Sequence, residues 1–303
     1  QYGLIMAKTE NKASVQKRGA GKHELSFGGK WQYAKAAEST DHVTIEDRYG
    51  LFIGGAWVRP KSGKYFRTVN PATEKQIASV AQANKKDVDL AVQAAQKAQP
   101  AWRKLSGDDR ARYLFRIARI LQERAREFAV LETLDNGKPI KETRDVDVPL
   151  AAQHFFYHAG WADKLDLLFP GEDPEPVGVV GQIIPWNFPL LMAAWKIAPA
   201  LAAGNTVVIK PAETSPLAAL RLCEVFEQAE LPPGVVNVVT GDGATGAALV
   251  RHPDLNKVAF TGSTDVGKEI QRAVAGRSVD LTLELGGKAA HLVFEDAALD
   301  QAV

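Results

Sequence analysis

The chain has 303 residues, of which 46% are hydrophobic and 24% are charged, a balance typical of a globular protein with a sizeable core. Its 37 basic and 36 acidic residues give a net charge of +1, which argues against nucleic acid or an anionic membrane as a partner. The only cysteine, Cys223, excludes an intramolecular disulfide and a cysteine zinc site, and it favours a reducing, cytoplasmic setting.

The first 48 residues are rich in lysine, glycine and serine without a sustained period, so we expect an irregular arm over 1–48. The chain starts without an initiator methionine or a signal-peptide pattern, and we expect its reading frame to begin further upstream. The stretch LFIGGAWV, residues 51–58, sets apolar residues around a Gly-Gly turn and predicts a β-hairpin.

A helical pattern begins at Asp87. SGDD, residues 106–109, has the spacing of a capping box, and DNGKP, residues 135–139, has the chemistry of a turn that ends a helix. Between them, apolar residues recur at intervals of three, four and seven and predict one apolar helical face: Tyr113, Leu114, Ile117, Leu121 and Phe128.

After Pro176, short apolar runs alternate with helical stretches, which predicts an α/β fold with a Rossmann-like parallel sheet covered by helices on both faces. Residues 177–195 carry no charge and are long enough to cross a bilayer. Pro185 and Pro189 would break a membrane-spanning helix, and the Asn187 amide would place a polar group in the lipid. A buried strand, a turn and a helix are expected instead, and no membrane partner is expected.

Polar and small residues gather where the expected strands end, which is where ligands bind in parallel sheets. GDGATG, residues 241–246, matches a dinucleotide fingerprint, or else its glycines only permit a tight turn. Lys210 and Glu213 suit the hydroxyls of a ribose, or else begin a solvated helix. FTGST, residues 260–264, forms an anion site at a helix start, or an ordinary cap.

Two further side chains suggest chemistry. Asn187, between aromatic residues and prolines, could be fixed as a donor to a developing oxyanion, or could simply satisfy a turn. Glu284 lies between leucines, and burial among apolar neighbours would suit it to act as a general base. Cys223 lies on a helix without a basic neighbour and is expected to pack in the core. The histidines show no metal spacing, so no metal site is expected.

Together, GQIIPWNFPLLMAAWKIAPALAAGNTVVIKPAE, LPPGVVNVVTG, KVAFTGST and LELGGK resemble the aldehyde dehydrogenase superfamily from about Leu51 onward. The resemblance implies that Asn187 is the oxyanion-hole amide and Glu284 the base that activates water. It also implies NAD rather than NADP, since Glu213 would repel a 2′-phosphate, and it makes GDGATG a turn more than a phosphate cradle. The implied cofactor-binding residues are Ile183, Ile184, Pro185, Trp186, Lys210, Ala212, Glu213, Gly243, Gly246, Phe260, Gly262, Ser263, Val266, Leu285 and Gly286.

The implied reaction is the oxidation of an aldehyde to a carboxylic acid through a cysteine thiohemiacetal and thioester. In the family, that cysteine follows Lys288 by more residues than remain before Val303, so this chain resembles an N-terminal portion that ends before the nucleophile. Residues 49–285 then form an NAD-binding domain with a reduced oligomerisation segment near 164–176, and 286–303 begin a catalytic domain. A homodimer or higher homo-oligomer is expected, and a catalytically incompetent NAD-binding or scaffolding relative is the alternative.

Overall fold

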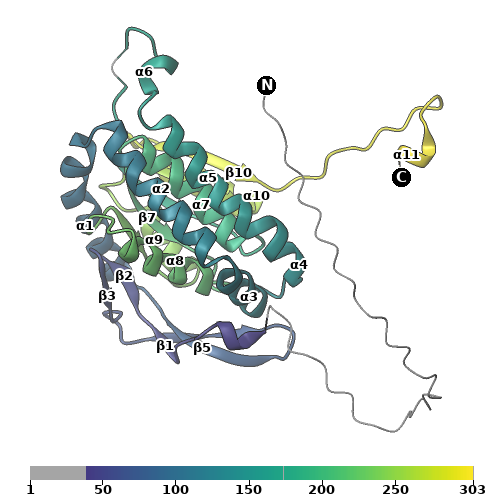
Figure 1. Ribbon diagram of the computed structural model, residues 1–303. Coiled ribbons are helices and arrows are strands. Elements are labelled where there is room, and N and C mark those ends of the chain that lie inside the picture. Colours follow the sequence, from purple (N-terminus) through teal and green to yellow (C-terminus); the bar gives the residue numbers. More distant parts are fainter. Residues whose placement is uncertain (1–38, 173, 303) are drawn as a thin grey trace, which may run out of the picture. The chain divides into compact units, whose positions relative to one another are not determined.

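The computed structural model describes residues 39–172 and 174–302 (Figure 1). Most of the arm expected over 1–48 therefore lies outside the described residues. In its described part, Thr40–His42 form a 3-10 turn, and Arg48 already belongs to strand β1 (Arg48–Tyr49).

The described residues contain a seven-stranded sheet with the order β10-β9-β6-β7-β8-β2-β3. The run from β10 to β8 is parallel, as the sequence predicts. The expected hairpin at 51–58 is also confirmed, but it joins β8 in the antiparallel sense and so makes the whole sheet mixed. The strands are β2 (Leu51–Ile53), β3 (Ala56–Val58), β6 (Val179–Ile183), β7 (Thr206–Lys210), β8 (Val236–Val238), β9 (Lys257–Gly262) and β10 (Asp280–Leu285).

The direction in which the chain builds this sheet reverses at β6. Strands β7 and β8 follow on one side of β6, whereas β9 and β10 lie on its other side. Such a reversal opens a crevice outside the carboxyl ends of the strands, where open α/β sheets bind their ligands. The topology therefore places the expected site at the ends of β6 and its two neighbours.

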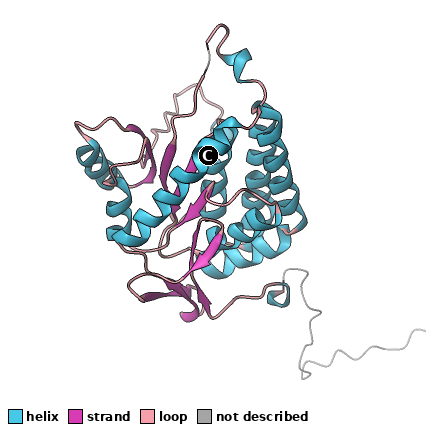
Figure 2. Ribbon diagram, turned by 90° about the vertical axis from the view of Figure 1, so that its left-hand side faces the viewer, coloured by secondary structure: helices cyan, strands magenta, loops and turns pink. Residues whose placement is uncertain are grey.

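Helices cover both faces of the sheet, because successive strand side chains point to opposite sides. Val208 belongs to a hydrophobic cluster that includes residues of α1, α9 and α10, while Val207 and Ile209 belong to a second cluster that includes residues of α2, α3, α5, α7 and α8. Figure 2 shows the strands between these helices. The helices are α1 (Lys85–Lys104), α2 (Gly107–Glu123), α3 (Ala125–Asn136), α4 (Ile140–Glu142), α5 (Val148–Trp161), α6 (Leu165–Leu168), α7 (Pro189–Ala202), α8 (Leu217–Gln228), α9 (Gly243–Val250), α10 (Thr264–Val274) and α11 (Leu299–Ala302).

A smaller sheet, β1-β5-β4, lies outside the parallel one in the described chain. Its other strands are β4 (Tyr65–Asn70) and β5 (Lys75–Ala81), which pair in the antiparallel sense. The residues after β5 lead directly into α1, where Asn84 and Asp87 form a complete capping box that the sequence analysis missed.

The predicted apolar residues all pack in one core, and Tyr113, Leu114, Ile117 and Leu121 lie on α2. Phe128 does not share their helix, because the helix ends at Arg124 and Phe128 lies on α3. Arg124 leaves the helical conformation, and its guanidinium binds Glu127 at 2.8 Å and Glu224 of α8 at 2.7 Å. These partners fix the break. The predicted start and end of the run are confirmed: Ser106 caps α2, and a left-handed Gly137 ends α3.

The uncharged stretch 177–195 folds as the sequence predicts, with β6, a turn and the first half of α7. Among the described residues no helix is long and apolar enough to cross a membrane. In the expected oligomerisation segment, α6 occupies Leu165–Leu168, and its role in assembly stays a prediction.

Candidate active site

The carboxyl ends of three neighbouring strands lie level with one another. Ile183 at the end of β6 pairs with Lys210 of β7 and with Phe260 of β9. On the next strand, Glu284 of β10 pairs with Thr261. Residues that are up to about a hundred positions apart in the sequence therefore share one edge of the sheet, as expected for parallel strands.

A cavity of about 520 Å³ opens at this edge, between α9 and α10. Of the residues implied as cofactor-binding, all except Leu285 and Gly286 line it. The helices contribute matching faces at intervals of three and four residues: Gly243, Gly246, Ala247 and Val250 from α9, and Val266, Glu269, Ile270 and Ala273 from α10.

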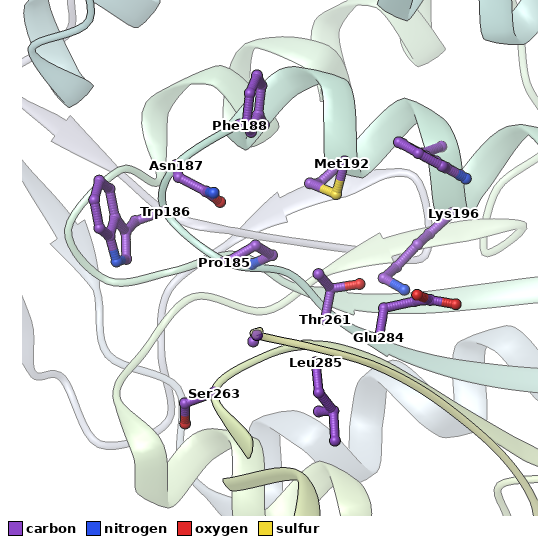
Figure 3. Close-up of a pocket in the computed structure, with 13 residues that line it drawn as sticks. Pro185, Trp186, Asn187, Phe188, Met192, Lys196, Thr261, Ser263, Glu284 and Leu285 are labelled. Carbon is purple, nitrogen blue, oxygen red and sulfur yellow. The ribbon is translucent and has the colours of Figure 1, made fainter. Parts of the chain in front are cut away.

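A second cavity, of about 590 Å³, adjoins the first and contains both residues expected to carry chemistry, Asn187 and Glu284. The two cavities share Pro185, Trp186 and the stretch 261–263. Leu285 and Gly286 line this second space. Figure 3 shows Asn187 on the loop before α7 and Glu284 on β10, both directed into the cavity. The structure thus brings all the expected site residues into two connected spaces.

Lys210 and Glu213 form a polar pair in the first cavity. The Lys210 side chain is 5% exposed, and its ammonium donates to Pro211 O at 3.0 Å and to Glu213 at 3.3 Å. Burial lowers the pKa of Lys210, while the charge of Glu213 opposes that change. Glu213 itself is half exposed, so its carboxylate remains open to hydroxyl donors on a ligand.

The starts of α9 and α10 differ in how they can receive an anion. Asp242 caps α9 and accepts from the N–H groups of Ala244 at 2.9 Å and Thr245 at 3.4 Å. A phosphate there would meet a carboxylate that already occupies the helix start. Helix α10 is capped instead by the neutral Ser263 hydroxyl, which accepts from Val266 N–H at 3.4 Å. The helix dipole and free N–H groups therefore favour an anion at α10.

Gly241 shows why GDGATG serves as a turn. Its φ is +153°, and a Cβ at this position would lie 2.1 Å from the Thr245 hydroxyl. A glycine is thus required for the chain to fold tightly between β8 and α9.

The backbone of the loop that carries Asn187 accepts hydrogen bonds from two residues that the sequence analysis did not single out. Asn136 Nδ2 and the Ser215 hydroxyl both donate to the carbonyl of Trp186. Pro189 then begins α7, and its fixed φ suits the first helical position. The Asn187 side chain itself is exposed to the cavity.

The expected burial of Glu284 is wrong, because its side chain is exposed. Its strand β10 is the last strand of the described sheet and pairs only with β9, so apolar neighbours in the sequence do not enclose it. Its prominent neighbour is Lys196 of α7, which Figure 3 shows extending toward it. Burial lowers the pKa of Lys196, and the charge of Glu284 opposes that change.

Lys196 belongs to a face of α7 that the sequence analysis missed. Phe188, Met192, Trp195 and Lys196 all line the second cavity. Their spacing of four, seven and eight residues from Phe188 is that of one helical face, which was the signal that could have revealed them.

Cys223 is fully buried in α8, and its sulfur donates to Ala219 O at 3.4 Å. Burial raises the pKa of this thiol well above its ordinary value, and Cys223 lines neither cavity. The predicted core role of Cys223 is confirmed. Among the described residues no cluster of histidine, cysteine or acidic side chains could hold a metal ion.

The order of the strands in the sheet reverses at β6, and a cavity opens at that point, which defines an α/β protein with an open, doubly wound sheet. The sequence model of the Aldehyde dehydrogenase family matches residues 57–303, and the chain belongs to that family. It is 48% identical over 270 residues to the aldehyde dehydrogenase of Alternaria alternata. The matched region is 86% of this chain and 54% of that protein. It is 49% identical over 265 residues to the mitochondrial aldehyde dehydrogenase family 2 member B4 of Arabidopsis thaliana, covering 84% of this chain and 49% of that one.

The fold is likewise that of solved family members. The NAD+ complex of the aldehyde dehydrogenase from Bacillus cereus matches with a TM-score of 0.80 and 44% identity, over 85% of this chain and 55% of that chain. This chain therefore spans about half the length of the relatives that it matches.

Proposed function

We propose that the protein is an NAD-dependent aldehyde dehydrogenase and that this chain supplies its cofactor site, its oxyanion donor and its general base. The observation that carries the proposal is the pair of connected cavities: one is lined by the expected cofactor residues, and the other contains Asn187 and Glu284. An aldehyde, water and NAD+ are converted to a carboxylic acid, NADH and a proton.

The residues of the first cavity fit a dinucleotide. Glu213 and Lys210 offer an acceptor and a donor for ribose hydroxyls, and the start of α10, capped by the Ser263 hydroxyl, offers N–H groups to a phosphate. Trp186 and Pro185 line both cavities, so a ring placed against them would reach the space of Asn187 and Glu284. When bound there, NAD accepts the hydride that leaves the substrate. The carboxylate of Glu213 would repel a 2′-phosphate, which favours NAD over NADP.

The chemistry assigned to this chain is electrostatic and acid–base. The Asn187 amide donates a hydrogen bond to the oxygen of the substrate as negative charge develops on it. Glu284 takes a proton from the water that releases the acid product. The exposure of Glu284 leaves it accessible to water, and Lys196 of α7 extends toward it.

The covalent step requires a cysteine thiolate, and Cys223 does not supply it. Cys223 is buried in α8 with a raised pKa and lines neither cavity. The proposal therefore assigns the nucleophile to residues that follow Val303, consistent with the half-length match to relatives.

The test is aldehyde-dependent NADH formation by the protein as its gene encodes it. Asn187→Ala should lower kcat by about 10²- to 10³-fold. Glu284→Gln should keep the first turnover and lose the later ones, because only release of the acid needs the base. Glu295→Gln, which changes an exposed carboxylate outside both cavities, is the matched control. Unchanged steady-state turnover in Glu284→Gln would contradict the role of Glu284.

The alternative is a catalytically incompetent NAD-binding or scaffolding relative, and the observation that favours it is the lack of a cysteine in either cavity of the described chain. Intact-mass analysis of the native protein separates the two proposals. A mass equal to that of this chain supports the relative, whereas a heavier protein with a cysteine beyond Val303 supports the enzyme.

A further inference from the structure

A group of charged residues is buried behind the loop that carries Asn187, and neither cavity uses it. Glu132 and Asp147 are fully buried, and the Lys138 side chain is 16% exposed. Burying charges costs free energy unless partners compensate, and exchanging such a group for apolar residues often leaves a fold equally stable. A role other than stability would account for its presence here.

Two turns bring these residues together. Lys138 follows the left-handed Gly137 that ends α3, the helix that carries Glu132. Asp147 is the last residue of a π-helical turn, η2 (Thr143–Asp147), which leads into α5. Such turns recur at functional positions, because the inserted residue redirects a side chain. Here the π-helical turn places the carboxylate of Asp147 in the protein interior beside α3.

The charges in this group are partnered. Lys138 Nζ forms an ion pair with Asp147 Oδ2. Glu132 Oε1 and Asp147 Oδ1 have no N–H or O–H donor in the described chain, yet the two carboxyl groups lie within hydrogen-bonding reach of each other. Burial, together with the neighbouring Asp147, raises the pKa of Glu132 well above its ordinary value. The Lys138 ammonium is the cation of this group.

This group touches the start of α7 at two points. Glu132 Oε2 accepts from Leu190 N–H at 3.1 Å and thus satisfies a donor of the first helical turn. Lys138 Nζ lies 3.7 Å from the centre of the Phe188 ring, close enough for a strong cation–π contact. Phe188 lines the second cavity and directly follows Asn187. The two contacts therefore fix the residues on the carboxyl side of Asn187.

Asn187 needs such support, because among the described residues its side chain has no hydrogen-bond partner of its own. A donor to an oxyanion must point in the correct direction before the reaction begins. We propose that Lys138 is a positioning residue for the aldehyde chemistry: held by Asp147, its ammonium fixes the Phe188 ring and so sets the direction of the Asn187 amide. The inference rests on the proposed function, and one arm of its test does not depend on activity.

The kinetic test compares Lys138→Met with Lys138→Arg and with Lys141→Met, an exposed lysine three residues on that contacts neither Phe188 nor Asp147. Lys138→Met should lower kcat about tenfold, with the KM for aldehyde and the affinity for NAD unchanged. Lys138→Arg should restore most of the loss, since a guanidinium also pairs with a carboxylate and stacks on a ring. Lys141→Met should match the wild type. A kcat within twofold of the wild type in Lys138→Met would overturn the proposal.

A double-mutant cycle tests whether Lys138 acts through Phe188. In a Phe188→Leu background, Lys138→Met should cause little further loss of kcat. A full tenfold loss in that background would overturn the proposal. Should Lys138→Met fail to fold, Lys138→Met/Asp147→Asn replaces it, because that pair removes the cation and its buried counter-charge together.

The independent arm is hydrogen exchange across residues 186–192, measured by mass spectrometry in the same proteins. Lys138→Met should speed exchange in this segment on the order of tenfold and leave α10 unchanged, while Lys141→Met alters neither. Unchanged exchange in 186–192 would overturn the positioning role. If the wild type oxidises no aldehyde, the proposed function fails, and this arm still decides the contact between Lys138 and the loop.

Discussion

Asp135 of α3 allows a sharp prediction about stability and pH. It is 2% exposed, and burial raises its pKa from 3.8 to about 7. Hydrogen bonds from the Thr68 hydroxyl at 2.5 Å and from Leu217 N–H at 2.8 Å oppose this rise but do not cancel it. The folded chain therefore keeps a proton on Asp135 over a pH range in which the unfolded chain has lost it.

The sign of the effect follows from that difference in bound protons. Between pH 3.8 and about 7 the folded state binds more protons at this site than the unfolded state, so the contribution of Asp135 to stability falls as pH rises. At about 1.36 kcal/mol for each pH unit, the loss between pH 5 and pH 8 amounts to roughly 2.5 kcal/mol. In a chain of this size that corresponds to a fall in Tm of roughly 4 °C.

The assay is thermal unfolding of the wild type and Asp135→Asn at pH 5 and at pH 8. An asparagine can still accept from Leu217 N–H and can donate to the Thr68 hydroxyl, but it does not ionise. Between pH 5 and pH 8, the free energy of unfolding of the wild type should fall by roughly 2.5 kcal/mol more than that of Asp135→Asn. Asp166→Asn, at an exposed position of α6, is the control and should follow the wild type. Parallel pH profiles for the wild type and Asp135→Asn would refute the reasoning.

Three other substitutions test separate parts of the argument. Glu213→Gln should raise kcat/KM for NADP relative to NAD on the order of tenfold by removing a carboxylate near the 2′ position; an unchanged ratio would exclude that contact. Asp242→Ala should lower the free energy of unfolding by about 1 kcal/mol through loss of the α9 cap, without changing the affinity for NAD in equilibrium dialysis; tighter binding would place a phosphate at the start of α9. Cys223→Ala should cost about 1–2 kcal/mol in chemical denaturation and leave NADH formation within about twofold, and a folded but inactive variant would contradict a core role for the thiol.

The parts of the fold that the sequence predicts are those set by local pattern. Apolar runs alternating with helical stretches specify parallel strands, and parallel strands carry the residues at their carboxyl ends to one edge. The residues around Ile183, Lys210, Phe260 and Glu284 meet for that reason. The turn at GDGATG was also predictable, because its glycines and the capping Asp242 act within a few residues of sequence.

The parts that the sequence does not predict depend on contacts between distant residues. At the break, Arg124 forms ion pairs with Glu127 and with Glu224, and Glu224 lies a hundred positions away in the sequence. The exposure of Glu284 follows from the place of β10 in the sheet, which its own leucines do not encode. Glu132 and Asp147 have the ordinary pattern of solvated helix charges, yet both are buried, Glu132 on α3 and Asp147 at the end of the π-helical turn before α5.

Strand β6, the following loop and α7 together connect the two cavities. Ile183 lines the cofactor cavity, Trp186 lines both, and Asn187, Phe188 and Lys196 line the second. Gln182 Nε2 of β6 donates to the carbonyl of Lys196 at 2.8 Å and so holds the middle of α7 against the strand. A displacement of the unit would move the oxyanion donor and the neighbour of Glu284 together, while Lys210, Glu213 and the start of α10 kept their places. Substitutions that remove contacts to this unit from outside the cavities should therefore lower kcat more than they weaken the affinity for NAD.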